Sequence, residues 1–379
     1  MSFIPSIILF FIISITKIKC NKPISFTIQI KQKNSLSIPL FTTKIGNSTI
    51  YTVYSGLNTS STLFYAFPKK CETSFMNGQC YKEDEKKKTN QTKEISIFGG
   101  HKEGPVYKET VEIGDSKFDL EFIYIDELGY NGYMNFGPQS LDYLKKNKII
   151  PASNIHFYPY NNGSINVTLG GNYNTSNKKY IDTCDIISGI SGCMLKKINI
   201  VNEKKKENKS FELNIPAVFF NSELFLANES VVVGNEEYIK KIREGLINNS
   251  YTCDNNSIFN CQAPNKTLYL IFGKEGIKLS KISFFPNKHP NLIFGFNTFK
   301  DIDIVIDYDK KKVFFYSGTF NTTSTTSNTK SGTTKLIIII SIIVGVLILG
   351  AILFYFLFHK KEKVNIETSG AETLLGEEN

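Results

Sequence analysis

One apolar segment near the C-terminus constrains this chain more than any other feature, because a water-soluble domain could not leave it uncovered. Residues 336–358 contain 23 amino acids and no charged side chain. About 20 apolar residues are enough for a helix to cross the hydrocarbon core of a membrane. His359, Lys360 and Lys361 follow immediately, and positive charge favours the cytoplasmic side. The sequence therefore predicts one transmembrane helix followed by a cytoplasmic tail at residues 359–379.

A second, shorter apolar run lies at the N-terminus, at residues 3–15. A run of this length in this position is typical of a secretory signal peptide, which we place at residues 1–20. Residues 319–335 consist mainly of Thr, Ser, Asn and Gly, a composition that predicts a stalk rather than a core. We therefore expect a single-pass type I membrane protein of the cell surface or an endomembrane, with an extracellular or lumenal ectodomain.

Every Asn-x-Ser/Thr sequon lies between these two apolar runs, which agrees with the predicted topology. One of them, Asn58, falls in a loop discussed below, where a glycan would not fit a closed cleft. We expect a glycoprotein, and the other predicted acceptors are Asn47, Asn90, Asn162, Asn166, Asn174, Asn208, Asn228, Asn248, Asn255, Asn265 and Asn321.

The cysteines also indicate an oxidising compartment. Cys20 lies at the predicted cleavage site, and the other six form three pairs that are close in sequence. Six cysteines allow fifteen connectivities, and we expect the three local disulfides. A zinc site is disfavoured because no pair has CxxC spacing and the four histidines are scattered, so we predict no metal and no cofactor. The predicted pairs are Cys71 with Cys80, Cys184 with Cys193, and Cys253 with Cys261.

The net charge of +9 does not point to a nucleic-acid partner. The basic clusters at residues 86–88 and 204–206 lie among Glu and Asn in loop-like stretches, which is typical of solvated loops. We expect the membrane and a peptide or protein to be the partners.

Alternating apolar residues between residues 21 and 318 predict a domain built of strands. About 300 residues are enough for two lobes of ordinary size. Helical patterns occur only at Ser140–Asn147 and Glu236–Asn248, so the predicted fold class is all-β. The clearest strand patterns are Ile24–Ile30, Val111–Gly114, Phe118–Ile125 and Ile302–Ile306.

Five segments carry a family resemblance through their order and spacing: residues 41–67, 131–151 (NGYMNFGPQSLDYLKKNKIIP), 163–171 (GSINVTLGG), 217–226 (AVFFNSELFL) and 292–316 (LIFGFNTFKDIDIVIDYDKKKVFFY). Together they resemble the pepsin-like aspartic peptidases. The resemblance implies a bilobal, pepsin-like (acid protease) fold with a substrate cleft between the lobes. We place the N-terminal β lobe at residues 21–180 and the C-terminal β lobe at residues 181–318.

In that family, two aspartates at the heads of Asp-Thr-Gly loops share one proton and activate a water molecule. Aligning Ser60-Ser61-Thr62-Leu63-Phe64 on the first loop puts Leu57 at the aspartate position, and moving the gap puts Ser55 there. In the second loop Phe220 takes that position, followed by Asn221 and Ser222. We expect Leu57 and Phe220 to face each other across the lobe junction.

Other positions depart from the family in the same direction. Phe98 replaces the tyrosine of the flap, Asn135 replaces a turn glycine, and Phe296 replaces an aspartate after the last such glycine. The nearest match to the catalytic triplet, Asp182-Thr183-Cys184, lies outside both loops. Glu223 is the only carboxyl near either loop, and its position is more typical of an exposed glutamate than of a substitute base.

The sequence thus predicts a catalytically inactive pepsin-like surface glycoprotein that binds a peptide or protein. Two alternatives remain open: a structural coat glycoprotein without a specific ligand, and an active membrane-anchored aspartic endopeptidase whose motifs are displaced. Cleavage of unfolded protein at acid pH would identify the peptidase.

Overall fold

The computed structural model describes residues 22–33, 36–57, 65–70, 80–97, 100–127, 132–159, 163–173, 178–220, 231–279, 283–299 and 301–317. The predicted signal peptide, stalk, transmembrane helix and tail all lie outside these residues. Within the part of the chain that is described, no helix is both long and apolar enough to span a bilayer.

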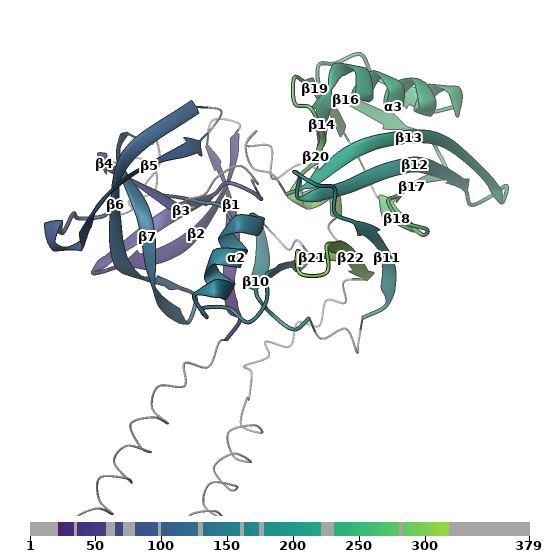
Figure 1. The fold of residues 1–379 in the computed structure, drawn as a ribbon. Coiled ribbons are helices and arrows are strands. Elements are labelled where there is room, and N and C mark those ends of the chain that lie inside the picture. The colour runs from purple at the N-terminus through teal and green to yellow at the C-terminus, as the bar shows by residue number, and fades with distance from the viewer. Residues whose placement is uncertain are drawn as a thin grey trace, which may run out of the picture. The chain divides into compact units, whose positions relative to one another are not determined.

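Strands dominate the described residues and form two sheets, which confirms the predicted all-β class (Figure 1). The first sheet has the order β11 (Tyr180–Asp185), β22 (Lys312–Ser317), β21 (Ile302–Asp307), β9 (Asn154–Phe157), β10 (Ser164–Leu169), β1 (Ile24–Lys33), β2 (Leu36–Ile45), β3 (Ser48–Tyr54), β8 (Tyr133–Met134), β4 (Tyr65–Lys70), β7 (Ser116–Glu127), β6 (Gly100–Ile113) and β5 (Lys88–Ile97). An additional pairing of β2 with β6 bends this sheet back on itself.

The second sheet uses the later part of the chain. Its order is β15 (Thr252–Cys253), β16 (Phe259–Gln262), β19 (Ser283–Asn287), β14 (Val231–Asn235), β20 (Leu292–Phe294), β13 (Glu207–Phe219), β12 (Gly192–Asn202), β17 (Lys266–Ile271) and β18 (Gly276–Leu279).

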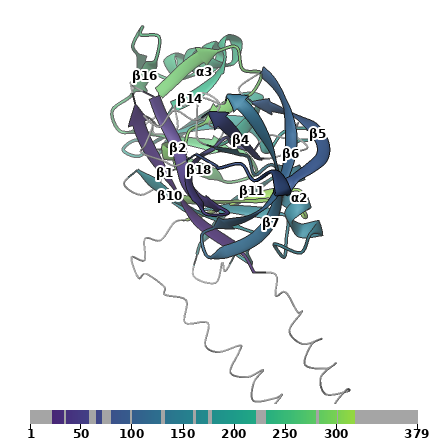
Figure 2. The same ribbon diagram turned by 90° about the vertical axis from the view of Figure 1, so that its left-hand side faces the viewer.

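The last described hairpin returns to the first sheet. Strand β21 pairs with β9, where Ile304 lies opposite Phe157, and β22 pairs with β11. In Figure 2 the neighbouring strands β1, β2 and β10 of the same sheet lie side by side. Residues between β11 and β21 build the second sheet, so the division into sheets differs from the lobe boundary drawn at residue 180.

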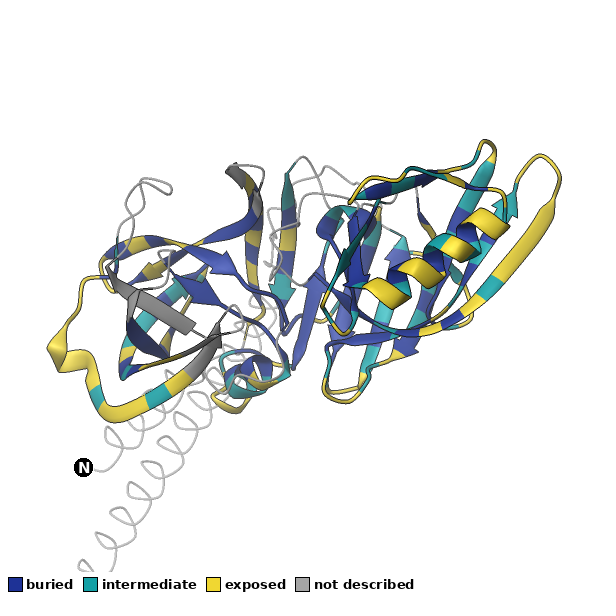
Figure 3. Cartoon of the chain, turned by 90° about the horizontal axis from the view of Figure 1, so that it is seen from above, coloured by how far each residue is buried: buried dark blue, intermediate teal, exposed yellow. Residues whose placement is uncertain are grey.

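Period-two patterns in the sequence become alternating burial in the strands. Ile50 and Thr52 of β3 are buried, and the intervening Tyr51 is 37% exposed. Figure 3 shows buried residues along the strands and a largely exposed outer side of helix α3 (Glu236–Asn248). Side chains from both sheets meet in one continuous hydrophobic core, as expected because each sheet can bury its apolar face only against another layer.

The two predicted helices are present. Helix α3 has the predicted bounds, and the Asn235 side chain caps it by accepting a hydrogen bond from the Glu237 amide at 2.8 Å. Helix α2 (Pro138–Lys146) starts two residues before the predicted Ser140, because proline in the first turn favours helix initiation. Two 3₁₀ turns, η2 (Glu85–Lys87) and η3 (Phe296–Phe299), complete the described helical structure.

Two of the three predicted disulfides are confirmed. Cys184–Cys193 joins β11 to β12 and so links the two sheets, while Cys253–Cys261 joins β15 to β16. Cys80 is also disulfide-bonded, but Cys71 lies outside the described residues. Its pairing with Cys80 therefore stays a prediction.

Candidate functional site

The same strand arrangement occurs once in each sheet. Strand β3 runs parallel to β8, with Tyr54 opposite Met134, and β13 runs parallel to β20, with Phe219 opposite Phe294. In both cases the next residue donates its backbone N–H to the last carbonyl of the neighbouring strand. Ser55 N donates to Met134 O at 2.8 Å, and Phe220 N donates to Phe294 O at 3.1 Å. Ser55 and Phe220 therefore occupy corresponding positions, which we call the first and second strand ends.

This register favours Ser55 over Leu57 as the counterpart of Phe220, and thus the second of the two alignments considered above. Leu57 lies two residues further along, is 3% exposed, and belongs to the same hydrophobic core as Phe220. Its carbonyl oxygen accepts a hydrogen bond from Ser191 Oγ at 2.8 Å, and Ser191 Oγ accepts one from the Tyr308 hydroxyl at 2.9 Å. The backbone at Leu57 thus anchors a loop of the first sheet to the segment that precedes β12.

At the first strand end, hydrogen bonds hold the turn against the neighbouring strand. Ser55 is 1% exposed, and its Oγ donates to Met134 O at 3.0 Å. Gly56 has a φ of +108°, which glycine adopts without strain, and its carbonyl accepts from Phe136 N at 3.1 Å. Asn135 Oδ1 accepts from Gly137 N at 2.8 Å, an interaction that a glycine could not provide. The hydroxyl of Ser55 is therefore committed to the backbone.

The second strand end is filled by aromatic rings. The Phe220 ring stacks on that of Phe296, with centroids 4.9 Å apart and planes 9° apart, and lies 4.6 Å from the ring of Phe157. Tyr54 extends this cluster, at 5.9 Å from Phe296. Phe157 and Tyr54 come from the first sheet and Phe220 from the second, so the rings pack across the junction of the two sheets. Aromatic rings therefore fill the centre of the junction.

Phe220 is also strained in its backbone. Its φ is +53°, a left-handed conformation that is rare for a bulky residue and costs about 1–2 kcal/mol. Phe220 is 2% exposed, and the packing of its ring against Phe296 and Phe157 offsets that cost. Backbone strain of this kind clusters at functional sites in proteins.

The buried ionisable groups include a tyrosine of this cluster and a charged group in the first sheet. Burial, with Tyr308 close by, raises the pKa of the Tyr54 hydroxyl well above its usual value. Asp303 is fully buried and is bound by Lys178, with His156 Nε2 3.3 Å from its Oδ2. Burial and the nearby Lys178 lower the pKa of His156 to about 3, so the imidazole is neutral over the usual pH range.

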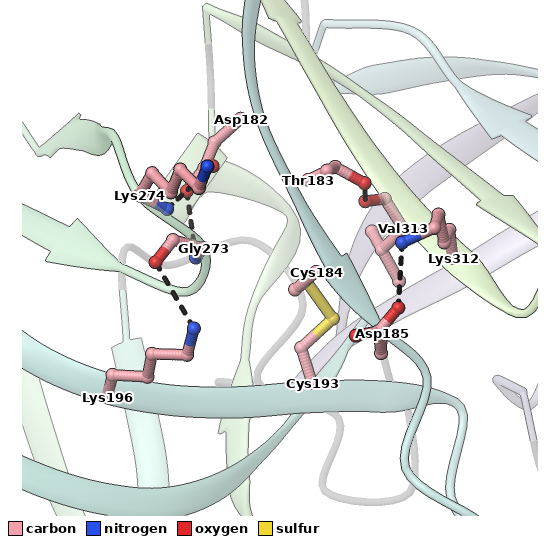
Figure 4. The surroundings of a disulfide bond; sticks show 10 residues. All are labelled: Asp182, Thr183, Cys184, Asp185, Cys193, Lys196, Gly273, Lys274, Lys312 and Val313. Carbon is pink, nitrogen blue, oxygen red and sulfur yellow. Dashed lines mark hydrogen bonds and ion pairs between the residues drawn. A yellow bond between two sulfur atoms is a disulfide. The ribbon is translucent and has the colours of Figure 1, made fainter.

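Asp182, of the triplet nearest to a catalytic motif, has a structural role. Its carboxylate is 3% exposed and accepts hydrogen bonds from Gly273 N at 2.8 Å and Lys274 N at 3.0 Å. It thereby ties the turn between β17 and β18 to strand β11 (Figure 4).

Several predicted site residues lie outside the described part of the chain: Phe98, Asn58, Asn221, Ser222 and Glu223. The sequon asparagines that the structure describes are all exposed, namely Asn47, Asn90, Asn166, Asn208, Asn248, Asn255 and Asn265. Among the described residues, no group of His, Cys, Asp and Glu side chains is arranged to hold a metal ion.

A cavity that sequence reasoning missed lies beside the Cys184–Cys193 disulfide. Its volume is about 660 Å³, and its walls come from β11, β12, the turn between β17 and β18, and the start of β22. Figure 4 shows charged side chains around this disulfide, among them Lys196, Lys274 and Lys312. No sequence motif could have indicated it, because segments that are distant in the sequence combine to form it.

No family model matches the sequence, and no curated protein does. Among solved structures, the aspartic proteinase from Irpex lacteus is similar, with a TM-score of 0.54. The match covers 80% of this chain and 98% of that chain, at 13% sequence identity. The likeness shows a pepsin-like fold for this chain.

Proposed function

We propose that this chain is a catalytically inactive pepsin-like glycoprotein that binds a peptide or protein instead of hydrolysing it. One observation carries the proposal: the corresponding residues at the two strand ends, Ser55 and Phe220, have no carboxyl group. In pepsin-like peptidases, two carboxyl groups at this junction share a proton and activate water.

The side chains that stand there cannot replace that chemistry. The Ser55 hydroxyl donates to Met134 O, and a hydroxyl without a neighbouring base does not take up a proton from water near neutral pH. The Phe220 ring has no exchangeable proton and packs against Phe296 and Phe157. General acid–base catalysis contributes about 10²–10⁴-fold to a rate. Without the two carboxyl groups, this chain would lose that factor and also the activation of the attacking water molecule.

The proposed location is a cell surface or an endomembrane lumen, with a single membrane anchor. Two features of the described residues support it. Both described disulfide pairs are of the kind that persists in oxidising compartments. The described sequon asparagines are exposed, as acceptors of glycans must be.

The test is an activity assay on the full-length protein in detergent. We expect no cleavage of an unfolded protein between about pH 3 and 6, where paired carboxyls work as acid and base. Pepstatin should leave the melting temperature unchanged, since its central hydroxyl would find no carboxyl partner. An active aspartic peptidase in the same detergent is the control. Pepstatin-sensitive cleavage by this chain would instead support the membrane-anchored endopeptidase.

A further inference from the structure

We propose that the cavity beside the Cys184–Cys193 disulfide binds a small ligand with an apolar body and a carboxylate group, such as the C-terminal end of a peptide. This inference deepens the proposed binding function and rests on it. It places the ligand away from the two strand ends, where the rings of Phe220, Phe296 and Phe157 already pack together.

The size of the cavity fits a ligand of two or three residues. A volume of about 660 Å³ lies within the range of about 300–1,000 Å³ that is common for small-molecule sites. Its apolar lining includes Phe272, which is fully buried, and Cys184, which is 7% exposed. Met194, Ile186 and Ile187 are half-buried and also line it. An apolar group of the ligand would cover these side chains.

The shape of one wall is fixed by the Asp182 hydrogen bonds described above. They hold Gly273 so close to β11 that a Cβ atom on it would lie 2.1 Å from the Thr183 carbonyl oxygen. Only glycine fits there. The cavity is therefore a built feature of the fold, held by a buried carboxylate and a disulfide.

Two lysine side chains that line the cavity have N–H groups left for an anionic ligand. Asp182 is bound by two backbone amides, and the Asp185 carboxylate is paired with Lys312 at 2.8 Å. The Asp185 charge is thus paired with a cation, and the two amides stabilise the negative charge of Asp182 without cancelling it. On the basic side, Lys196 Nζ donates to Gly273 O at 3.3 Å and retains two further N–H groups. The ammonium group of Lys274 has no bonded partner among the residues that the structure describes.

Glu275 brings a negative charge to the same cavity. It lines the cavity, is exposed, and forms no ion pair within the described residues. Its charge opposes an anionic ligand, so a carboxylate should bind more tightly when Glu275 is neutralised. A purely structural role of these three side chains would not give opposite signs for lysine and glutamate variants.

The experiment compares two probes that differ only in charge. N-acetyl-leucyl-phenylalanine carries a free carboxylate, and its C-terminal amide does not. Binding to the full-length chain in detergent is followed by saturation-transfer NMR. We expect the acid to bind several-fold more tightly than the amide, and its binding to weaken with added salt. Equal binding of acid and amide, or binding of neither, would overturn the proposal.

Variants locate the binding. Lys196→Gln and Lys274→Gln should each weaken the acid by about two- to fivefold, the range for an exposed ion pair, and Glu275→Gln should tighten it. Lys278→Gln, on the neighbouring strand β18 but outside the cavity lining, is the matched control and should change nothing. Unchanged binding in both cavity lysine variants would place the ligand elsewhere and overturn the inference.

A third probe, octanoate, distinguishes the two sources of such a ligand. Tighter binding of the dipeptide acid would identify a peptide terminus, and tighter binding of octanoate would identify a fatty acid; both support a site for an apolar carboxylate. The peptidase assay remains a separate test. Cleavage of protein in that assay would refute the proposed lack of catalysis, but it would not change the measured binding of the probes to the cavity.

Discussion

The two strand ends share the same strand pairing but differ in local backbone conformation and in side-chain chemistry. At the first, Ser55 and Asn135 close the turn with hydrogen bonds, and Gly56 supplies the positive φ. At the second, Phe220 takes a positive φ itself and is held by ring packing. The position of each end is set by the hydrogen bond to the neighbouring parallel strand, which both share. The strand pairing therefore sets the backbone position at both ends, whichever side chain stands there.

The energies of the two ends should differ accordingly. A hydrogen bond from a buried hydroxyl contributes about 0.5–1.5 kcal/mol to stability. Replacing a buried phenylalanine by alanine costs about 3–5 kcal/mol. If the comparison holds, the second end is the main source of stability at the junction.

The largest expected effect follows from removing the ring of the second end. Phe220→Ala should lower the free energy of unfolding by about 3–5 kcal/mol, because it leaves a cavity against Phe296 and Phe157. Ser55→Ala, the control at the first end, should lower it by only about 1 kcal/mol, since Met134 O keeps its bond from Ser55 N. Urea unfolding measures both, and equal losses would break the comparison.

A second prediction uses acid pH, to which neither strand end can respond because neither carries a titratable group. His156 can, since its pKa is lowered to about 3 in the folded state and is about 6.5 when unfolded. Below pH 6.5 the unfolded chain binds a proton at His156 that the folded chain does not bind. The contribution of neutral His156 to the free energy of unfolding is therefore complete above pH 6.5. It is lost as the pH falls toward 3, by about 1.4 kcal/mol per unit at most.

Thermal unfolding at several pH values measures that loss. His156→Gln should flatten the dependence between pH 6.5 and pH 4, while Phe220→Ala should keep the slope of the unchanged chain at a lower stability. An identical slope in His156→Gln would show that His156 is not the group that titrates.

The hydrogen-bonded loop beyond the first end gives a third, smaller effect. Ser191→Ala removes the donor to Leu57 O and the acceptor of the Tyr308 hydroxyl. We expect a loss of about 1–3 kcal/mol, because two polar groups are left without their partner. Tyr308→Phe removes only one of the bonds and should cost less, so calorimetry that ranked the two variants in the opposite order would contradict the bond chain.

The smallest effect concerns backbone strain alone. Phe220→Gly should be more stable than Phe220→Ala by up to about 1 kcal/mol, because glycine adopts a φ of +53° freely. At the adjacent strand residue Phe219 the order should reverse, since glycine weakens a strand. A lower stability of glycine than alanine at both positions would mean that the left-handed conformation of Phe220 carries no strain.

Local features of the fold were predictable from the sequence. The bounds of α3 and the two described disulfides follow from neighbouring residues, which carry the helical pattern and the close cysteine spacing. The predicted strand Val111–Gly114 is only the end of β6, which begins at Gly100. Its first half has no apolar alternation and is held by pairing with β5.

The candidate site was harder to predict because its geometry depends on distant residues. The choice between Ser55 and Leu57 rests on hydrogen bonds to Met134, 79 residues away from Ser55. An alignment gap can be moved by two residues at no cost in the sequence, but a strand register cannot. The cavity beside Cys184 likewise requires the turn at Gly273, which only the folded chain brings to β11.

The return of the last hairpin to the first sheet has a consequence for biosynthesis. Until residues 302–317 leave the ribosome, β9 has one bare edge and β11 has no partner in its sheet. Bare edges recruit other chains, and such unfinished domains are the species that chaperones retain. The second sheet, whose strands all precede Ile302, can close earlier in translation. A premature stop before that residue would therefore yield a chain whose first sheet stays open at β9 and β11.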